Sequence, residues 1–418
     1  MNAKPLDGTI VLDLTTALSG PYATMLLASL GARVIKIENP QTGGDSSRNN
    51  APYVTKEGIS LQRSSSEDMS LSMMLRGRNK ESVLLDLKSG TGREVFLELA
   101  SQAHVVVENY SPGVTRRLGI DYDAVSAVNP RIIYTSITGF GTAGGTDGLK
   151  AMDAIIQAMS GVMFTAGEEG QDPVRFGLPM GDLIAPLYAV IGTLAAQRHL
   201  DLTGEGQFVD VSMLGSLTSL VAIEPFETLE ALGIPQRTGS HVPRLAPFGT
   251  FATRNGFFAL SAPTDPMARS VFAGIGMAEL GADPRFSTRD GRVSHSSQLH
   301  GIIQDWAAGL DNHDAVTRLA AAGAPVAPVR QPAEAIRDAQ VLARGEVVPL
   351  IGKAGAEGTI YASGVPIQMS RVTTTLDNPA HALGADTESV LGGMLGYTPE
   401  RIATITGRAL SSTGRLSD

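Results

Sequence analysis

A strand, a helix and a second strand follow one another at the start of the chain, and this unit most constrains the fold. Residues 9–14 (TIVLDL) form a short apolar run, which predicts a buried strand. Ser19, Pro21 and Gly31 are placed as start and stop signals of a helix, and residues 33–38 (RVIKIE) predict the second strand. Strands joined by a helical crossover lie parallel in one sheet. The chain therefore begins as an α/β fold.

The same alternation continues to about residue 223. Further strands are predicted over 82–87, 104–108, 131–138 and 208–213, and helices over 91–101, 122–128, 152–163 and 182–199. We therefore expect a large α/β domain over 1–223, followed by a linker over 224–255 that is rich in Pro, Arg and turn residues. Residues 256–330 predict a smaller domain, and residues 331–418 a C-terminal segment that returns to the large domain.

Composition excludes several classes of protein. The 33 Lys and Arg against 42 Asp and Glu give a net charge of −9, which disfavours nucleic acids and anionic membranes as partners. The chain has no Cys, so it has no disulfide, thiol nucleophile or thiolate metal site. The seven His residues lack metal-ligating spacings, and no apolar run reaches about 18 residues. The N-terminus does not read as a secretory signal, so we expect a cytoplasmic protein without a bound metal.

Asp182 is the sharpest candidate for a functional side chain. It stands directly after Gly181, at the start of the apolar helix predicted over 182–199. An Asp at the first turn of a helix commonly stabilises the helix N-terminus. A carboxylate against apolar walls can also act as a nucleophile, because burial changes its pKa and reactivity. Position alone leaves both roles open.

Three cations are expected near a ligand crevice. Lys88, Arg117 and Lys150 each follow a predicted strand or lie at a loop–helix junction. Loops after parallel strands converge on one edge of the sheet, where such cations suit phosphates, although each one alone is typical of solvated surface. Residues 139–144 match G-x-G-x-x-G, but no helix signal follows at once. We therefore favour a loop that covers a substrate over an NAD site.

The sequence resembles the family III CoA-transferases, a group that includes formyl-CoA transferase, carnitine CoA-transferase and α-methylacyl-CoA racemase. The resembling segments include PLDGTIVLDLTTALSGPYATMLLASLGARVIKIENP, NKESVLLDLKSGTGREVFLELASQAHVVVENYSPGVTRRLGI, NPRIIYTSITGFGTAGG, GLPMGDL and TGEGQFVDVSML. The resemblance is closest over residues 6–213. It implies a Rossmann-like large domain and a smaller α+β domain, in an interlocked homodimer.

The resemblance also implies a reaction and a site. The enzyme would move CoA from an acyl-CoA to a small carboxylic acid, with Asp182 forming a covalent aspartyl intermediate. CoA would be a substrate, with no permanently bound cofactor. Matching positions for CoA contacts are Thr16, Ala17, Leu18, Leu85, Lys88, Asn109, Tyr110, Arg117, Lys150 and Met213. Asn39 stands where formyl-CoA transferase has Arg, and Arg76 or Arg78 could replace that phosphate contact.

Departures from the family pattern bear on the alternatives. A racemase of this family needs a His where this chain has Met152, and this departure weighs against that activity. An acyl-CoA isomerase or racemase is therefore only the second hypothesis. A non-catalytic CoA-binding subunit is the third, and the presence of Asp182 argues against it. The linker region 239–249 (GSHVPRLAPFG) lacks the glycine run of formyl-CoA transferase, which disfavours formyl-CoA and oxalate as substrates. Arg244, with His241 and Phe248, could bind a dicarboxylate acceptor, or Arg244 could be structural.

Overall fold

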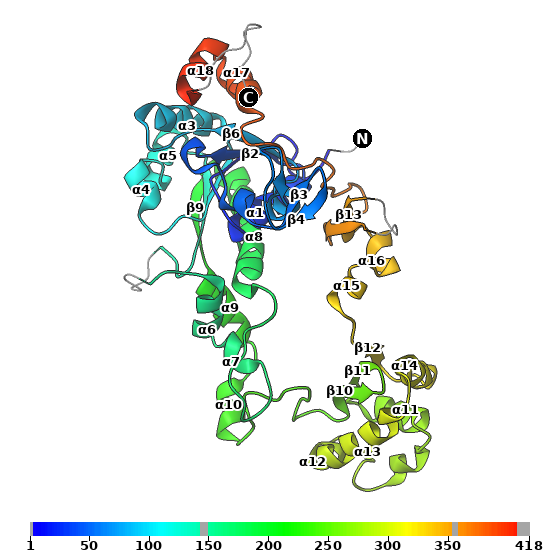
Figure 1. Cartoon of the computed structure of the whole chain (residues 1–418). Helices are drawn as coiled ribbons and strands as arrows, with labels where there is room; N and C mark the ends of the chain where they lie inside the picture. Colours follow the sequence, from blue (N-terminus) through cyan, green and yellow to red (C-terminus); the bar gives the residue numbers. More distant parts are fainter. Residues whose placement is uncertain (1–2, 143–148, 353–357, 408–418) are drawn as a thin grey trace. The chain divides into compact units, whose positions relative to one another are not determined.

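Six parallel strands form the central sheet of the protein (Figure 1). Their order is β6-β2-β1-β7-β8-β9, and every neighbouring pair is parallel. The strands are β1 Ile10–Asp13, β2 Arg33–Glu38, β6 Lys80–Leu84, β7 Val105–Glu108, β8 Ile133–Thr138 and β9 Gln207–Ser212. The predicted α/β fold is therefore confirmed. The carboxyl ends of all six strands meet at one edge of the sheet.

This computed structural model describes residues 3–142, 149–352 and 358–407, which fall into two units. The first unit takes the described residues within Met1–Ser160, Gly177–Leu220 and Ile336–Asp418. The second takes Gly161–Phe176 and Val221–Ala335. Each unit has its own hydrophobic core, and each is considered by itself below.

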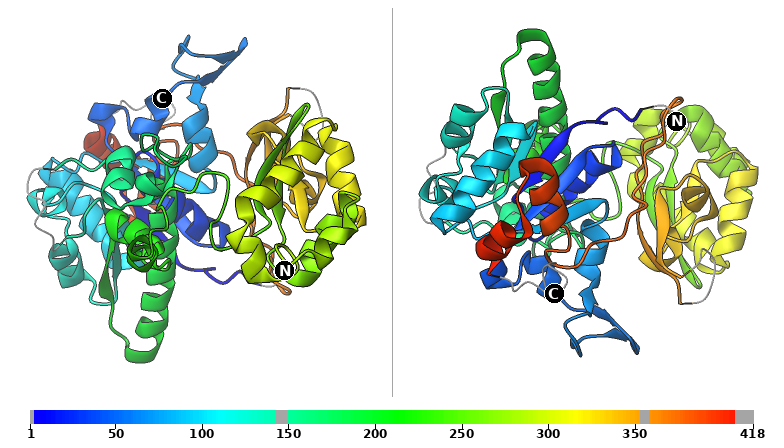
Figure 2. Two further views of the ribbon diagram at one scale, coloured as in Figure 1. Left: turned by 90° about the horizontal axis from the view of Figure 1, so that it is seen from below. Right: turned by 90° about the horizontal axis from the view of Figure 1, so that it is seen from above.

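Helices cover both faces of the six-stranded sheet. Helices α1 (Ser19–Ser29) and α8 (Met180–Thr203) pack together on one face (Figure 1). On the other face, α3 (Gly90–Gln102) packs with α5 (Tyr122–Val128) and with α17 (Thr387–Leu395). Alternate strand residues such as Leu12, Ile35 and Val106 fill the core on that second face, together with Phe96 of α3 and Leu391 of α17. Figure 2 shows the same arrangement in two further views.

The second unit is a small α+β assembly. Strands β10 (Phe248–Thr253), β11 (Gly256–Ser261) and β12 (Val326–Pro328) form an antiparallel sheet. Its helices include α11 (Asp265–Gly274), α13 (Ser296–Ala308) and α14 (Asn312–Ala321). The core between sheet and helices contains Phe251, Phe258, Phe272, Phe286 and Leu299.

The remaining elements connect or flank these two units. The further helices are α2 Leu71–Arg76, α4 Val114–Leu118, α6 Asp153–Met159, α7 Val162–Thr165, α9 Met213–Val221, α10 Phe226–Ala231, α12 Arg289–Ser294, α15 Pro332–Ala335, α16 Ala339–Ala343 and α18 Pro399–Thr406. The short 3₁₀ helices are Pro40–Thr42, Ser46–Asn49 and Ala278–Ala282. The further strands are β3 Tyr53–Thr55, β4 Gly58–Ser60, β5 Met69–Ser70, β13 Val347–Ile351 and β14 Ile360–Ser363.

Two of the differences from the sequence prediction have a clear physical reason. The single helix expected over 152–163 is two helices, α6 and α7, because Gly161 has a φ of +85° and interrupts the helical backbone. The β3–β4 hairpin was not predicted, and it extends away from the six-stranded sheet (Figure 2). Its strands have only three residues each, too few to give a recognisable alternation.

Helix α8 alone among the described residues is long and apolar enough to pass a length-and-composition test for a membrane span. Core helices of soluble proteins pass the same test, and 39% of the apolar window is buried within the chain. The test by itself is weak support for a span. The helix packs against β8 and β9 of the central sheet.

Candidate active site

A cavity of about 350 Å³ opens where four neighbouring strands, β1, β2, β6 and β7, end. Five of the ten predicted CoA contacts line it, namely Thr16, Leu85, Lys88, Tyr110 and Arg117. Lys88 and Arg117 are exposed, and no described carboxylate lies within ion-pair distance of either. Two unpaired cations beside an apolar wall of Leu85 and Leu87 suit a nucleotide that carries phosphates.

The loop after β1 borders this cavity and is held by its backbone. The Thr16 N–H donates to Asn109 Oδ1 at 2.9 Å, and Asn109 Nδ2 donates to the Thr16 carbonyl at 2.9 Å. The Ala17 N–H donates to Asp45 Oδ1 at 2.9 Å. Ala17 has a φ of +67°, a conformation that side chains other than glycine rarely adopt. These bonds fix the direction of the Thr16 and Ala17 peptide groups.

A buried ion cluster lies beneath the same loop. Lys36 donates to the Thr15 carbonyl at 2.7 Å and forms an ion pair with Asp45 at 2.8 Å. Asp13 accepts from Lys80 at 3.0 Å. Burial opposes ionisation of Asp13, but Lys36 and Lys80 outweigh it and hold the pKa of Asp13 well below its usual value. Lys36 thus ties the loop to the cluster, and removing one member would leave a buried charge unpaired.

Asp182 lies in the first turn of α8, as the sequence predicts. The preceding Gly181 N–H donates to Asp153 Oδ1 at 2.8 Å, so Asp153 holds the N-terminus of the helix. A Cβ at Gly181 would stand 3.2 Å from Met213 Cε and from Ile156 Cγ2, so this turn is closely packed. Met213 therefore lies beside the Asp182 turn and does not line the cavity.

The Asp182 carboxylate is half-buried, and no described cation lies within ion-pair distance of it. Burial first, and then the negative charge of Asp153, raise the pKa of Asp182 to about 6, while Arg76 acts in the opposite direction. At neutral pH the group is ionised but more basic than an ordinary aspartate. Perturbed carboxylates of this kind are frequent among catalytic groups.

Arg76 acts on Asp182 through its charge and on the Thr16–Ala17 loop through a hydrogen bond. It is the last residue of α2, and its Nη1 donates to the Ala17 carbonyl at 2.6 Å. Its charge acts on Asp182 and on Asp45. Neither Arg76 nor Arg78 lines the cavity at Asn39, and Arg78 is buried with its Nη2 on the Ser363 carbonyl at 2.6 Å. The structure therefore gives no support to either Arg as a replacement phosphate contact.

Four other predicted site residues, Asn109, Ala17, Leu18 and Lys150, do not line the cavity. Asn109 reaches the cavity only through Thr16, and Ala17 and Leu18 continue the loop toward α1 without lining the cavity. Lys150 is exposed, three residues before α6 begins, and does not line the cavity. In the glycine motif 139–144, residues 143 and 144 lie outside the described residues. Thr142, the last one described before them, donates from its N–H to Asp210 Oδ2 at 2.9 Å.

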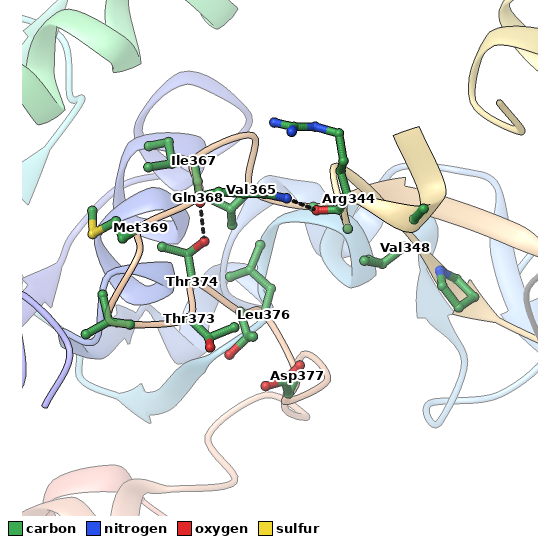
Figure 3. A pocket seen from close by; sticks show the side chains of 16 residues that line it. Arg344, Val348, Val365, Ile367, Gln368, Met369, Thr373, Thr374, Leu376 and Asp377 are labelled. Atoms are coloured by element: carbon green, nitrogen blue, oxygen red, sulfur yellow. Dashed lines mark hydrogen bonds between the residues drawn. The ribbon is translucent and has the colours of Figure 1, made fainter. Parts of the chain in front are cut away.

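Two larger cavities lack a comparable reactive centre. The one shown in Figure 3, of about 670 Å³, is lined by residues 343–349 and 364–377. Two of its labelled polar side chains hold the loop itself: Gln368 donates to the Arg344 carbonyl and Thr374 to the Ile367 carbonyl. The other, of about 630 Å³ in the second unit, contains His241 stacked on His300. Burial lowers the pKa of His300 to about 4, so His300 is neutral at pH 7.

The proposed acceptor residue Arg244 is already paired. Its Nη2 lies 2.7 Å from Glu224 Oε2, and both side chains are about half exposed. A paired, solvated guanidinium has little free capacity for a substrate carboxylate. This geometry favours the structural role that the sequence left open for Arg244.

Sequence reasoning missed three polar residues that act at this centre: Asp45, Arg76 as a neighbour of Asp182, and Asp153. Asp45 and Arg76 come from a segment, residues 40–78, with little periodic pattern to place them. Asp153 could have been identified from the sequence, because an acidic residue at the start of an apolar helix often caps a helix end. Here it accepts from the first turn of α8 and does not cap its own helix, α6.

Three comparisons with known proteins each find a match over most of the chain. Residues 6–387 match the profile of CoA-transferase family III. The chain is 31% identical over 401 residues to a succinate–glutarate CoA-transferase of Agrobacterium fabrum, covering 96% of this chain and 98% of that protein. It is 34% identical over 378 residues to a succinyl-CoA:mesaconate CoA-transferase of Haloarcula hispanica, covering 90% and 91%. A solved CaiB/BaiF family structure from Brucella suis is 29% identical, with a TM-score of 0.81 and coverage of 94% and 100%.

Proposed function

The chain belongs to CoA-transferase family III, and we propose that it moves CoA from an acyl-CoA to a dicarboxylic acid through a covalent intermediate on Asp182. One observation carries the proposal. A half-buried carboxylate without an ion-pair partner among the described residues stands at a helix N-terminus, with its pKa raised to about 6. The charge of Arg76 acts on this carboxylate, and Arg76 donates to the loop that borders a cavity with two unpaired cations.

The first half of the reaction makes an enzyme-bound thioester. An Asp182 carboxylate oxygen attacks the thioester carbonyl carbon of the acyl-CoA, the C–S bond breaks, and CoA leaves as a thiolate. The thiolate then attacks Cγ of Asp182 in the resulting mixed anhydride and releases the first carboxylate. A thioester between Asp182 and CoA remains. No net proton is gained or lost in these steps.

The second half reverses the first with a different acid. A carboxylate oxygen of the acceptor attacks Cγ of Asp182 and expels the thiolate. The thiolate then attacks the acceptor carbonyl of the new anhydride, which frees Asp182 and releases the new acyl-CoA. CoA must stay bound while its thiolate is free, and a nucleotide held in the 350 Å³ cavity keeps that thiolate close to its target.

The raised pKa of Asp182 suits its role as the nucleophile of the first half. A more basic carboxylate is the better nucleophile toward the thioester carbonyl. The group is nonetheless ionised at pH 7, because about 6 is below that pH. Burial and Asp153 therefore set its reactivity without preventing its ionisation.

The dicarboxylic acceptor is supported by the relatives. The proteins from Agrobacterium fabrum and Haloarcula hispanica carry the names of succinate, glutarate and mesaconate, which are all dicarboxylic acids. A CoA-transferase acts on CoA thioesters as substrates, and Lys88 and Arg117 are the side chains that we assign to the CoA phosphates. A cytoplasmic location stays a prediction of the sequence.

We further propose that the protein is a homodimer, interlocked as the family resemblance implies. Helices α6 and α8 pack together and leave large apolar side chains exposed. The exposed fractions are 44% for Ile155, 40% for Leu187, 38% for Tyr188 and 62% for Ile191. Uncovered apolar side chains on adjoining helices favour burial against another chain. Light scattering during gel filtration measures the mass directly, and a single-chain mass of 43.7 kDa would contradict the dimer.

The function is tested by transfer assays on matched variants. Wild type, Asp182→Asn and Asp201→Asn are incubated with a panel of acyl-CoAs and dicarboxylic acids, and new CoA esters are measured by mass spectrometry. Asp201 is an exposed residue near the other end of α8, so it controls for loss of charge on the same helix. We expect Asp182→Asn to lose more than about 10³-fold of the rate, as nucleophile removal does elsewhere. Full transfer by Asp182→Asn would contradict the proposal.

A further inference from the structure

Arg76 has hydrogen-bond donors that no described residue accepts from. Its Nη1 donates to the Ala17 carbonyl, and no described carboxylate lies within ion-pair distance of the guanidinium. The side chain is half-buried, and burial lowers the pKa of Arg76 below its usual value. An arginine has five N–H donors, so most of this group is free to bind another anion.

Asp45 and Asp182 are the two acids whose charges act on Arg76, and neither forms an ion pair with it. Asp45 is saturated, since it pairs with Lys36 at 2.8 Å and accepts N–H bonds from Ala17 and Ser47. Asp182 lies beyond ion-pair distance, although its ionisation is assisted by Arg76. By contrast, Arg48 holds Glu38 through two bonds of 2.7 and 2.6 Å.

Three other cations considered for the site have different roles. Lys88 and Arg117 line the cavity that we assign to the nucleotide, and Arg244 pairs with Glu224. Arg76 is the cation whose charge acts on Asp182. An acyl group that reacts at Asp182 is therefore exposed to the charge of this guanidinium.

We propose that Arg76 binds the distal carboxylate of a dicarboxylic acyl group while its other carboxyl group reacts at Asp182. This inference rests on the proposed function and names the residue that selects its substrate class. The reacting carboxyl group is neutral in the thioester and in the anhydride, whereas the distal carboxylate keeps its charge throughout. A planar guanidinium can hold that carboxylate by two parallel bonds at every stage.

The test compares matched pairs of unreactive acyl-CoA analogues, in which a CH₂ replaces the thioester sulfur. Calorimetry gives Kd for the succinyl and butyryl analogues and for the glutaryl and valeryl analogues, with wild type, Arg76→Gln and Arg76→Lys. Arg131→Gln is the control, because Arg131 also donates one Nη1 bond to a carbonyl, that of Gly204, at the opposite edge of the sheet. Covalent turnover is not needed, so a failure of the Asp182 mechanism would leave these affinities interpretable.

We expect wild type to bind the dicarboxylic member of at least one pair more tightly. Arg76→Gln should reduce that preference by about 10- to 100-fold, the value of hydrogen bonds to a charged group. Arg76→Lys should reduce it less, because the charge remains without the planar fork. Equal weakening of both members would assign Arg76 to the Ala17 loop alone and overturn the proposal. The proposal would also be overturned if Arg76→Gln kept the preference for the dicarboxylic analogue. It would be overturned as well if wild type showed no such preference in either pair.

Discussion

Replacing Asp182 by Asn should stabilise the folded protein at pH 8, although it removes the proposed nucleophile. Burial and Asp153 raise the pKa of Asp182 from 3.8 to about 6, so its ionised form is disfavoured in the folded state. That difference corresponds to about 3 kcal/mol. Because the side chain is only half-buried, we expect solvent to reduce the gain to about 1–2 kcal/mol.

The sign of the pH dependence follows from the raised folded-state pKa of Asp182. Its contribution to stability is fully present below 3.8 and is lost as pH rises through about 6. The advantage of Asp182→Asn should therefore be largest at pH 8 and clearly smaller at pH 5. Urea unfolding followed by circular dichroism, at one protein concentration, measures both free energies.

The matched control for this experiment is Asp201→Asn, at the exposed end of the same helix. It should change the free energy of unfolding by less than about 0.5 kcal/mol at either pH. An Asp182→Asn protein that is less stable than wild type at pH 8, or equally stabilised at pH 5 and pH 8, would refute the reasoning. Asp182 would then be an ordinary helix-capping residue.

Three further results are expected. Asp153→Asn removes a charge that raises the pKa of Asp182, so the acid limb of the kcat/KM profile, expected near pH 6 in wild type, should move to lower pH; an unmoved limb would contradict this. Arg117→Gln should raise KM for acyl-CoA on the order of tenfold and weaken its dependence on salt, with a smaller effect on kcat, as initial rates at two ionic strengths would reveal. Asp45→Asn leaves Lys36 poorly paired and should destabilise the fold by about 3 kcal/mol in urea unfolding; a change below about 1 kcal/mol would argue against the buried cluster.

Much of the fold could be predicted from local sequence patterns. The expected strand over 33–38 coincides with β2, and the expected helix over 122–128 coincides with α5. These segments have strong apolar periodicity, which tertiary packing reinforces. Where one residue changes the backbone, as Gly161 does between α6 and α7, the apolar pattern alone did not reveal the break.

The site was less accessible to prediction than the fold. Asp182 could be found because it opens a long apolar helix, and Lys88 and Arg117 because they follow strands of a parallel sheet. Arg76 and Asp45 could not be placed, since their partner Ala17 is 59 and 28 residues away in the chain. Only the folded sheet brings these segments together, and no local pattern encodes that contact.

The central claim is the covalent use of Asp182, and mass spectrometry of the intact protein tests it most directly. Wild type, Asp182→Asn and Asp201→Asn are incubated with a panel of acyl-CoAs, with and without hydroxylamine, and then digested to locate any modification. We predict an acyl or CoA adduct on Asp182 that hydroxylamine releases, that is absent from Asp182→Asn and that persists in Asp201→Asn. Wild type that forms no adduct with any donor, yet exchanges the Cα proton of an acyl-CoA for deuterium, would contradict the account and make Asp182 a proton carrier.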